Sequence, residues 1–283
     1  MAVRLLIDSS SDFIKEEAES LGVAFLPLTI QWEGKTYRDQ VDISHREFYT
    51  RLIECADLPT TCQLTPYDYE EALGPLTENG DEVVIIALSS KLSGTCQSAQ
   101  IAARSYPGQV YVVDSLNATF GEQILIRYAI RLRDAGLPGA AVAQKLDEAK
   151  GRIRLIALVD TLEYLKRGGR ISAVTAAAGG LLSIKPVVSV EEGEVRVIGK
   201  ARGSKKANNL LTELIAKTGG IDFSMPCCLG YSGLEDGTLR KYVEDSAALW
   251  KGRTESLPVA TIGAVIGTHV GPGAFGAAFF SHS

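Results

Sequence analysis

The feature that most constrains this chain is a pattern of strand, polar loop and helix that occurs three times in its first half. Each unit starts with an apolar run, "VRLLID" (3–8), "EVVIIALSS" (82–90) or "QVYVVDS" (109–115), and continues through polar residues into a helix-like segment. Strands that alternate with helices in this way pair in a parallel sheet, because each crossover helix returns the chain to the same end of the sheet. The pattern therefore predicts an α/β fold with a parallel sheet.

The polar loops after these three strands are expected to face one crevice, because the carboxyl ends of parallel strands meet at one edge. The loops are Asp8 to Asp12, Ser89 to Thr95 and Asp114 to Thr119. Helix amino-ends at that edge favour negative charge. The stretch "LSSKLSGTCQSA" (88–99) places hydroxyls and a lysine there, where they could supply a nucleophile, hold a phosphate or bind another anion.

Between the first two units the sequence predicts a hairpin and two helices. Two strand-like runs in "LPLTIQWEGKTYRD" (26–39) flank a turn at Glu33 and Gly34, and "SHREFYTRLIEC" (44–55) has helical spacing. In "LPTTCQLTPYDYEEAL" (58–73), Thr65 is placed to cap a helix that opens at Pro66. This is a second stretch with hydroxyls at a helix start.

After about residue 151 the pattern changes to antiparallel features. A strand and short helix end at Gly168 and Gly169, a hairpin turns at Glu192 and Gly193, and a helix is predicted with Ser204 as its cap. A strand, a helix from Asp236 and an apolar, glycine-rich end follow. We therefore predict an N-terminal α/β domain over 1–155 and a C-terminal α/β domain over 156–283, with the ligand site between or across them.

Charge and composition exclude several classes of function. The net charge is −5 and the Lys and Arg residues are spread along the chain, which argues against a nucleic-acid partner. No apolar segment approaches the roughly 20 residues that a membrane span needs, and the start lacks a signal-peptide core, so a cytoplasmic location is expected. The five cysteines form no C-x-x-C pair and the three histidines lie far apart, so no metal site is predicted.

Nucleotide motifs are absent or out of context. "GPGAFG" (271–276) satisfies G-x-G-x-x-G, but the sequence ends seven residues later, which leaves no room for the acidic ribose partner, and Pro272 removes an amide. There is no G-x-x-x-x-G-K-[ST] sequence, and "YSGLE" around Ser232 is not G-x-S-x-G. An ATP loop and a hydrolase elbow are therefore both excluded.

Several single residues have both a functional and an ordinary interpretation. Ser93 could be a nucleophile with His269 as its base, if the two loops meet between the domains. Ser93 and Thr61 could equally be turn or cap hydroxyls, and His269 a core or turn histidine. Arg170 and Arg202 are by default solvated charges.

A series of ordered motifs resembles the DegV family of bacterial fatty-acid-binding proteins across nearly the whole chain. The motifs are "DSSSD", "TTCQLTP", "LSSKLSGTCQSA", "DSLNATFG", "LEYLKRGGRIS", "IKPVVSV" with "EGEV", "ARGSKKA" and "GAVIGTHVGPGAFG". The resemblance implies two α/β domains, the first related to part of the dihydroxyacetone kinases. It also implies a buried long-chain fatty acid such as palmitate, with no cofactor besides this ligand.

The same resemblance implies a non-catalytic role in fatty acid metabolism. Its best understood members hold the acid while a separate, ATP-dependent fatty acid kinase subunit phosphorylates the carboxylate, and the acyl phosphate goes to phospholipid synthesis. By motif, Thr61 and Ser93 would bind the carboxylate, while Arg170, Arg202 and His269 would support the head group or face the kinase. A transient contact with a membrane surface would allow ligand exchange. The alternative is an enzyme that acts on a small anionic or acyl substrate through Ser93 and His269.

Overall fold

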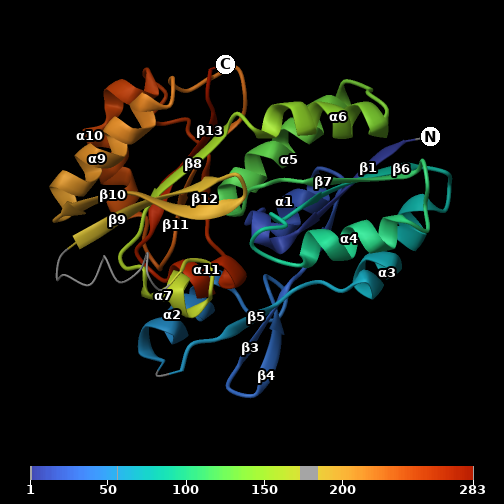
Figure 1. Ribbon diagram of the computed structural model, residues 1–283, viewed down its shortest axis with the longest axis horizontal. Helices are drawn as coiled ribbons and strands as arrows, with labels where there is room; N and C mark the ends of the chain where they lie inside the picture. Colours follow the sequence, from blue (N-terminus) through green and yellow to red (C-terminus); the bar gives the residue numbers. More distant parts are fainter. Residues whose placement is uncertain (1, 56, 173–183, 283) are drawn as a thin grey trace.

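The computed structural model describes residues 2–55, 57–172 and 184–282 and arranges them around two β-sheets that stand side by side (Figure 1). The strands are β1 (Val3–Asp8), β2 (Val23–Leu26), β3 (Thr29–Trp32), β4 (Lys35–Arg38), β5 (Thr60–Cys62), β6 (Glu82–Ala87), β7 (Val110–Asp114), β8 (Ile153–Leu158), β9 (Ile184–Glu191), β10 (Glu194–Arg202), β11 (Cys227–Tyr231), β12 (Val259–Thr261) and β13 (Phe275–Phe280). The α-helices are α1 (Lys15–Ser20), α2 (His45–Glu54), α3 (Pro66–Thr77), α4 (Thr95–Ala103), α5 (Thr119–Asp134), α6 (Gly139–Lys150), α7 (Glu163–Arg167), α9 (Ser204–Lys217), α10 (Gly237–Asp245) and α11 (Ala264–Val270), and η1 (Ser9–Ser11) and η2 (Ala247–Trp250) are 3₁₀ turns.

The first sheet is parallel, in the order β2-β1-β6-β7. Its strands are apolar on both faces because helices cover both, α5 and α6 on one side and α3 and α4 on the other (Figure 1). Alternate residues divide between these layers: Leu5 packs with α5 and α6, and Leu6 packs with α3 and α4. The predicted parallel α/β sheet is confirmed.

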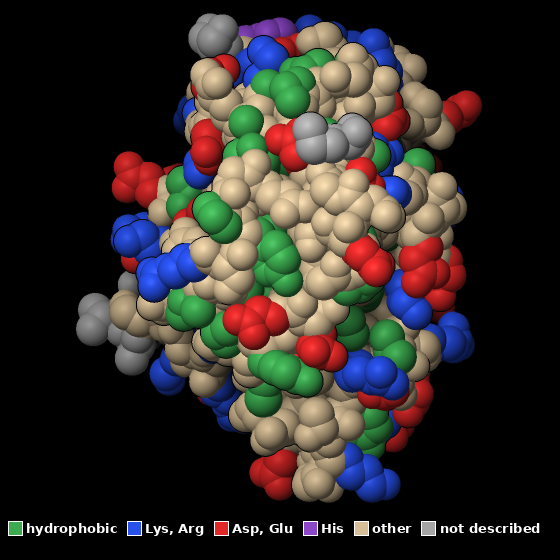
Figure 2. Space-filling model, turned by 90° about the vertical axis from the view of Figure 1, so that its right-hand side faces the viewer, with side chains coloured by type: hydrophobic (Ala, Val, Ile, Leu, Met, Phe, Trp, Pro, Cys, Tyr) green, Lys and Arg blue, Asp and Glu red, His purple; other side chains and the backbone are tan. Residues whose placement is uncertain are grey.

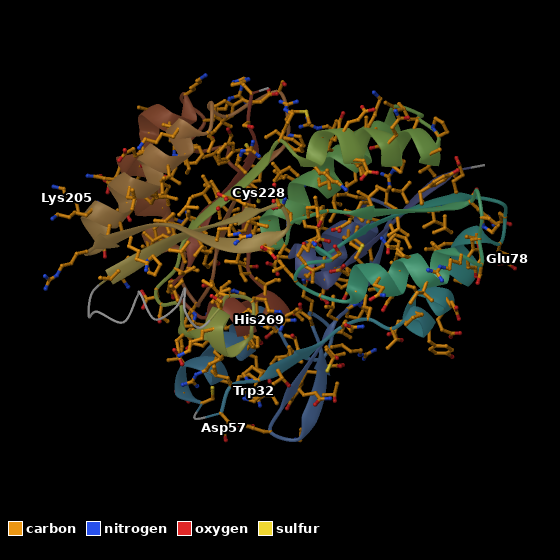
Figure 3. The ribbon with its side chains drawn as sticks, viewed as in Figure 1. Trp32, Asp57, Glu78, Lys205, Cys228 and His269 are labelled. Carbon is orange, nitrogen blue, oxygen red and sulfur yellow. The ribbon has the colours of Figure 1, made fainter. Side chains whose placement is uncertain are left out.

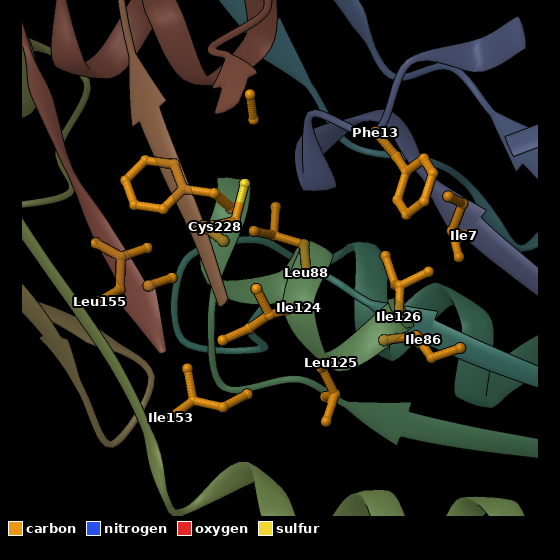
Figure 4. Packing of buried hydrophobic residues seen from close by; sticks show 14 of the residues in the cluster. Ile7, Phe13, Ile86, Leu88, Ile124, Leu125, Ile126, Ile153, Leu155 and Cys228 are labelled. Atoms are coloured by element: carbon orange, nitrogen blue, oxygen red, sulfur yellow. The ribbon is translucent and has the colours of Figure 1, made fainter. Parts of the chain in front are cut away.

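The second sheet is mixed and mostly antiparallel, in the order β10-β9-β8-β13-β11-β12. On β8, Ile156 and Leu158 face the layer that contains α9 and α10, whereas Leu155 and Ala157 face the first sheet and its helices. Figure 4 shows Leu155 and Cys228 in one cluster with Leu88 and Ile124. One hydrophobic core is therefore shared by the two halves.

A small third sheet, β4-β3-β5, lies below the junction with α2, α7 and α11 (Figure 1). The predicted hairpin turns at Glu33 and Gly34, which both have positive φ, and Thr65 caps α3 with a reciprocal bond to Asp68. Both predictions are confirmed. The predicted cap at Ser204 is wrong, because Gly203 takes the cap position and Ser204 is already helical.

The predicted domain boundary at 155/156 falls inside β8, and the division of the chain into two domains stays a prediction. The small and apolar stretch "AVTAAAGGLLSIKPVV" (173–188), a candidate for the wall of an apolar ligand site, lies outside the described residues at positions 173–183. Among the described residues, no helix has both the length and the hydropathy that a membrane-spanning segment needs. On the face shown in Figure 2, acidic and basic side chains are interspersed.

Candidate functional site

A cavity of about 410 Å³ lies in the shared core between the two sheets. Its volume is within the range of roughly 300–1,000 Å³ that small-molecule sites occupy. Most of the wall is apolar: Leu28, Leu88, Leu92, Ala118, Phe120, Leu155, Ala157, Val159, Leu165, Val188, Val190, Val195, Ile262, Val265, Ile266, Val270, Ala274 and Phe275 contribute to it. The polar side chains on the wall are Thr61, Gln63, Ser93, Thr119, Arg170, Ser189 and His269.

Thr61 and His269 form a hydrogen bond at one end of this cavity, and they come from opposite halves of the chain. Thr61 is on β5 and His269 is near the end of α11, below the junction of the sheets (Figure 3); Thr61 Oγ1 and His269 Nε2 are 2.9 Å apart. Burial, reinforced by the positive charge of Arg170, lowers the pKa of His269 to about 4. The imidazole is therefore neutral at pH 7.

Ser93 lies in the loop between β6 and α4, close to the Thr61 segment. Its hydroxyl is 3.0 Å from Thr95 Oγ1 and accepts from the Thr95 N–H at 3.2 Å. Gly94 allows the close approach of the two segments, because a Cβ at Gly94 would lie 2.2 Å from the side-chain oxygen of Gln63. The sequence analysis did not single out Gln63, although it lies within the quoted "TTCQ" motif.

Arg170 joins the same end of the cavity from the segment after α7. Its Nε donates to the Leu92 carbonyl at 3.1 Å and a terminal nitrogen donates to the Gly168 carbonyl. Burial lowers the pKa of this guanidinium from its ordinary value. The arginine thereby fixes the loop that carries Ser93 against the end of α7, which packs on α11.

The structure brings four of the five predicted site residues to one cavity and leaves the fifth elsewhere. Thr61, Ser93, Arg170 and His269 line the cavity, whereas Arg202 is exposed at the end of β10 and does not. A Ser–His nucleophile needs a direct hydrogen bond between its two members. The Ser93 hydroxyl faces Thr95 and the His269 Nε2 faces Thr61, an arrangement that favours binding over nucleophilic attack.

A smaller cavity of about 280 Å³ adjoins the polar end, with Thr61, Arg170 and His269 in the wall of both. Its other lining residues are Leu58, Pro59, Thr60, Arg167, Gly168 and Thr268. The sequence analysis missed Arg167, although it lies in the quoted "LEYLKRGGRIS" motif. A ligand head group at Thr61 would therefore have an exposed cation on its far side.

The loops after β1 and β7 meet as predicted, but Asp12 in the first of them, like Asp39 after β4, serves a structural role. Asp12 accepts from the Gly263 N–H at 2.8 Å and from the Thr119 hydroxyl, and Asp39 accepts from the Ala264 N–H at 3.0 Å. Burial raises the pKa of Asp12, and raises that of Asp39 to about 6. These two side chains hold the start of α11 and thus position His269 at its other end.

Within residues 2–55, 57–172 and 184–282, no group of three or more His, Cys, Asp or Glu side chains could hold a metal ion. At the cavity, hydroxyl, imidazole and guanidinium groups are available for hydrogen bonding beside an apolar wall. Such a combination suits a carboxylate or similar anion with a long apolar body.

Comparison with known proteins gives matches along the whole chain. The model of a family described as "Uncharacterised protein, DegV family" matches residues 2–282. A DegV domain-containing protein of Caldanaerobacter subterraneus is 35% identical over 280 residues, which is 98% of each chain. Another, from Deinococcus radiodurans, is 35% identical over 283 residues, again 98% of each.

Solved structures match equally well. A fatty-acid-binding DegV family protein of Thermus thermophilus has a TM-score of 0.89 at 34% identity, and the match covers 100% of both chains. A DegV lipid-binding protein of Thermotoga maritima has a TM-score of 0.86 at 30% identity, with 99% of this chain and 98% of that one covered. A stearic acid-binding protein of Eubacterium ventriosum has a TM-score of 0.87 at 27% identity over 99% and 98% of the chains.

Proposed function

Because this chain belongs to the DegV family, we propose that it binds a long-chain fatty acid such as palmitate in the cavity between its sheets, with the carboxylate at Thr61 and Ser93. The observation that carries the proposal is the make-up of this one cavity, an apolar wall with a cluster of hydrogen-bonding groups at one end. The fatty acids bound by the similar Thermus thermophilus and Eubacterium ventriosum proteins support it.

The two ends of such a ligand contribute differently to the free energy of binding. A sixteen-carbon chain buried at about 0.8 kcal/mol per methylene gains roughly 12 kcal/mol before ordering costs. The carboxylate contributes orientation, since without donors its burial would cost several kcal/mol. With the imidazole proton on Nε2, His269 donates to Thr61 Oγ1, and the Thr61 hydroxyl proton is left for a ligand oxygen.

The proposal includes a non-catalytic role beside a separate kinase. The smaller cavity on the far side of Thr61 and His269 is where an ATP-dependent fatty acid kinase subunit would reach the carboxylate, with Arg167 and Arg170 beside the transferred phosphate. We also assign Arg202 to the surface that faces the kinase. Ligand exchange at a membrane surface and a cytoplasmic location complete the proposal.

Organic extraction of the purified protein should release one long-chain acid per chain, identified by mass spectrometry. Each hydroxyl bond to a carboxylate contributes about 1.5–3 kcal/mol, so Thr61→Val with Ser93→Ala should weaken rebinding of palmitate by at least roughly 100-fold. The matched control changes two exposed hydroxyls, Thr36→Val with Ser90→Ala, and should leave the Kd unchanged.

Two results of this experiment would contradict the proposal. An empty protein that hydrolyses acyl esters, and loses this activity on Ser93→Ala, would establish the enzyme alternative. Unchanged palmitate affinity in the double variant would remove Thr61 and Ser93 from the site. For the kinase, the loaded protein with a fatty acid kinase subunit, ATP and hydroxylamine should yield the fatty acyl hydroxamate, and an unmodified acid would remove this part of the proposal.

Gly168→Ala should disturb the head-group end without changing the fold. The new Cβ would lie 2.1 Å from His269 Nδ1, so the imidazole must shift, which disturbs its hydrogen bond with Thr61. We expect palmitate affinity to fall about tenfold, the equivalent of one hydrogen bond to a charged group, as measured by calorimetry. Gly151→Ala is the control, because it is also a helix C-cap with ordinary φ and its Cβ would meet nothing within 4 Å. Equal affinities of the two variants would show that His269 has no part in head-group binding.

A further inference from the structure

A second pocket, of about 380 Å³, lies farther along α5, and the residues described in its wall are all different from those of the fatty acid cavity. Thr119 and Phe120, at the start of α5, line the fatty acid cavity, whereas Arg127 and Arg131 line the second pocket. The separation of seven to twelve residues places the two sites roughly 10–18 Å apart along the helix. The other walls come from the end of α1 and from the segments 223–227 and 253–258.

All charged side chains among the described residues of this pocket are arginines, namely Arg127, Arg131 and Arg253. This is a marked local excess in a chain whose net charge is −5. We call it the arginine pocket.

Within the described part of the chain, two of these arginines, Arg131 and Arg253, have no carboxylate at salt-bridge distance. Arg127 pairs with Glu17 at 3.0 Å, although its buried Nε has no hydrogen-bond partner among the described groups. Arg131 donates to the Ser224 carbonyl at 2.9 Å, and no described acidic side chain lies within 4.0 Å of the Arg253 guanidinium. Burial raises the pKa of Cys227, whereas the positive charges of Arg131 and Arg253 both lower it. The two guanidinium groups therefore both lie near this thiol.

Apart from Ser256, the other described residues of the arginine pocket are mostly apolar. Phe223, Met225 and Leu257 line it together with two prolines. The guanidinium carbon of Arg253 lies 5.0 Å from the centre of the Phe223 ring, which orients this cation beside the apolar surface. Planar guanidinium groups bind phosphate oxygens through paired N–H donors. The pocket therefore combines free phosphate donors with a surface for a short apolar group.

We propose that the arginine pocket binds a phosphate ester that carries an apolar body, with the phosphate at Arg131 and Arg253 and the apolar part on Phe223 and Leu257. A phospholipid head group and a soluble alkyl phosphate share this chemistry. The proposal concerns residues outside the fatty acid cavity and does not depend on what that cavity holds.

Calorimetric titration of the full chain tests the proposal with four probes. These are dihexanoylphosphatidylglycerol below its micellar concentration, hexyl phosphate, inorganic phosphate and dihexanoylphosphatidylcholine. We expect one of the first two to bind at least tenfold tighter than inorganic phosphate, and which one it is distinguishes a lipid source from a soluble one. If phosphatidylglycerol is the tighter ligand, phosphatidylcholine, which has no net charge, should bind at least tenfold more weakly than phosphatidylglycerol.

Arg131→Gln with Arg253→Gln should abolish this binding, while Arg46→Gln, a change to an exposed arginine on α2, should not affect it. A second measurement avoids any effect of substitution on folding. The bound probe should slow alkylation of Cys227, located by peptide mass spectrometry, because this thiol lines the pocket. The proposal is overturned if no probe binds, if inorganic phosphate binds as tightly as both esters, or if the double variant binds normally and Cys227 is not protected.

Discussion

Ala157→Trp is expected to abolish fatty acid binding, because the indole would occupy the cavity in place of the ligand. Ala157 is in the middle of β8 and lines the cavity, while its neighbours Ile156 and Leu158 face the layer that contains α9. The added side chain therefore points into existing empty space. We expect palmitate affinity to fall roughly 100-fold or more, since most of the apolar contact is lost.

Two further variants distinguish loss of binding through a filled cavity from loss of binding through misfolding. Ala157→Leu should fill only part of the cavity and shift the acid that copurifies toward shorter chains, as measured by mass spectrometry. Ala140→Trp adds the same indole at an exposed position of α6 and should leave binding unchanged. An Ala157→Trp protein that still carries one long-chain acid per chain, with normal thermal unfolding, would show that the ligand lies elsewhere.

Asp12→Ala should lower the free energy of unfolding by about 3 kcal/mol, because the buried Gly263 N–H and Thr119 hydroxyl both lose their acceptor. Asp12 has a φ of 52°, which Asn tolerates better than Ala. Asp12→Asn keeps one acceptor oxygen and should cost much less. Urea unfolding at pH 7 measures both, and Asp134→Ala, which breaks an exposed ion pair, should change stability by less than about 1 kcal/mol.

The pH dependence of these proteins gives an independent check. Burial raises the folded-state pKa of Asp12, so the folded state binds more protons than the unfolded state at any pH above the ordinary pKa of 3.8 and below the raised value. This group therefore contributes most stability at low pH, and the contribution declines as the pH rises through that interval. Asp12→Asn should remove the decline. A wild-type slope that persists in Asp12→Asn would assign it to another buried acid, such as Asp39.

Local signals in the sequence were enough to predict the elements whose cause is local. The turn at Glu33 and Gly34, the cap at Thr65 and the parallel units of β1, β6 and β7 follow from residues within a few positions of one another. The resemblance to the DegV family, based on ordered motifs, is confirmed by the family match. The prediction that Ser204 caps α9 was wrong, because Gly203, which has a positive φ, takes the cap position one residue earlier.

What the sequence could not predict depends on pairing between distant segments. The place of β13 between β8 and β11 joins strands more than 40 residues apart, and no local pattern specifies it. The contact of Thr61 with His269, and the absence of Arg202 from the cavity wall, likewise depend on how the halves pack. Gln63 and Arg167 lay inside motifs that were noticed for other residues.

Because the cavity lies within the core shared by the two halves, a ligand bound there would be a part of the fold. A core with an unfilled space loses stability in proportion to the space, and a molecule that binds only the folded state restores it. A loaded chain would then unfold less often than an empty one, and proteases that act on opened chains would remove the empty one first. The lifetime of the protein would thus depend on the supply of the fatty acid that it binds.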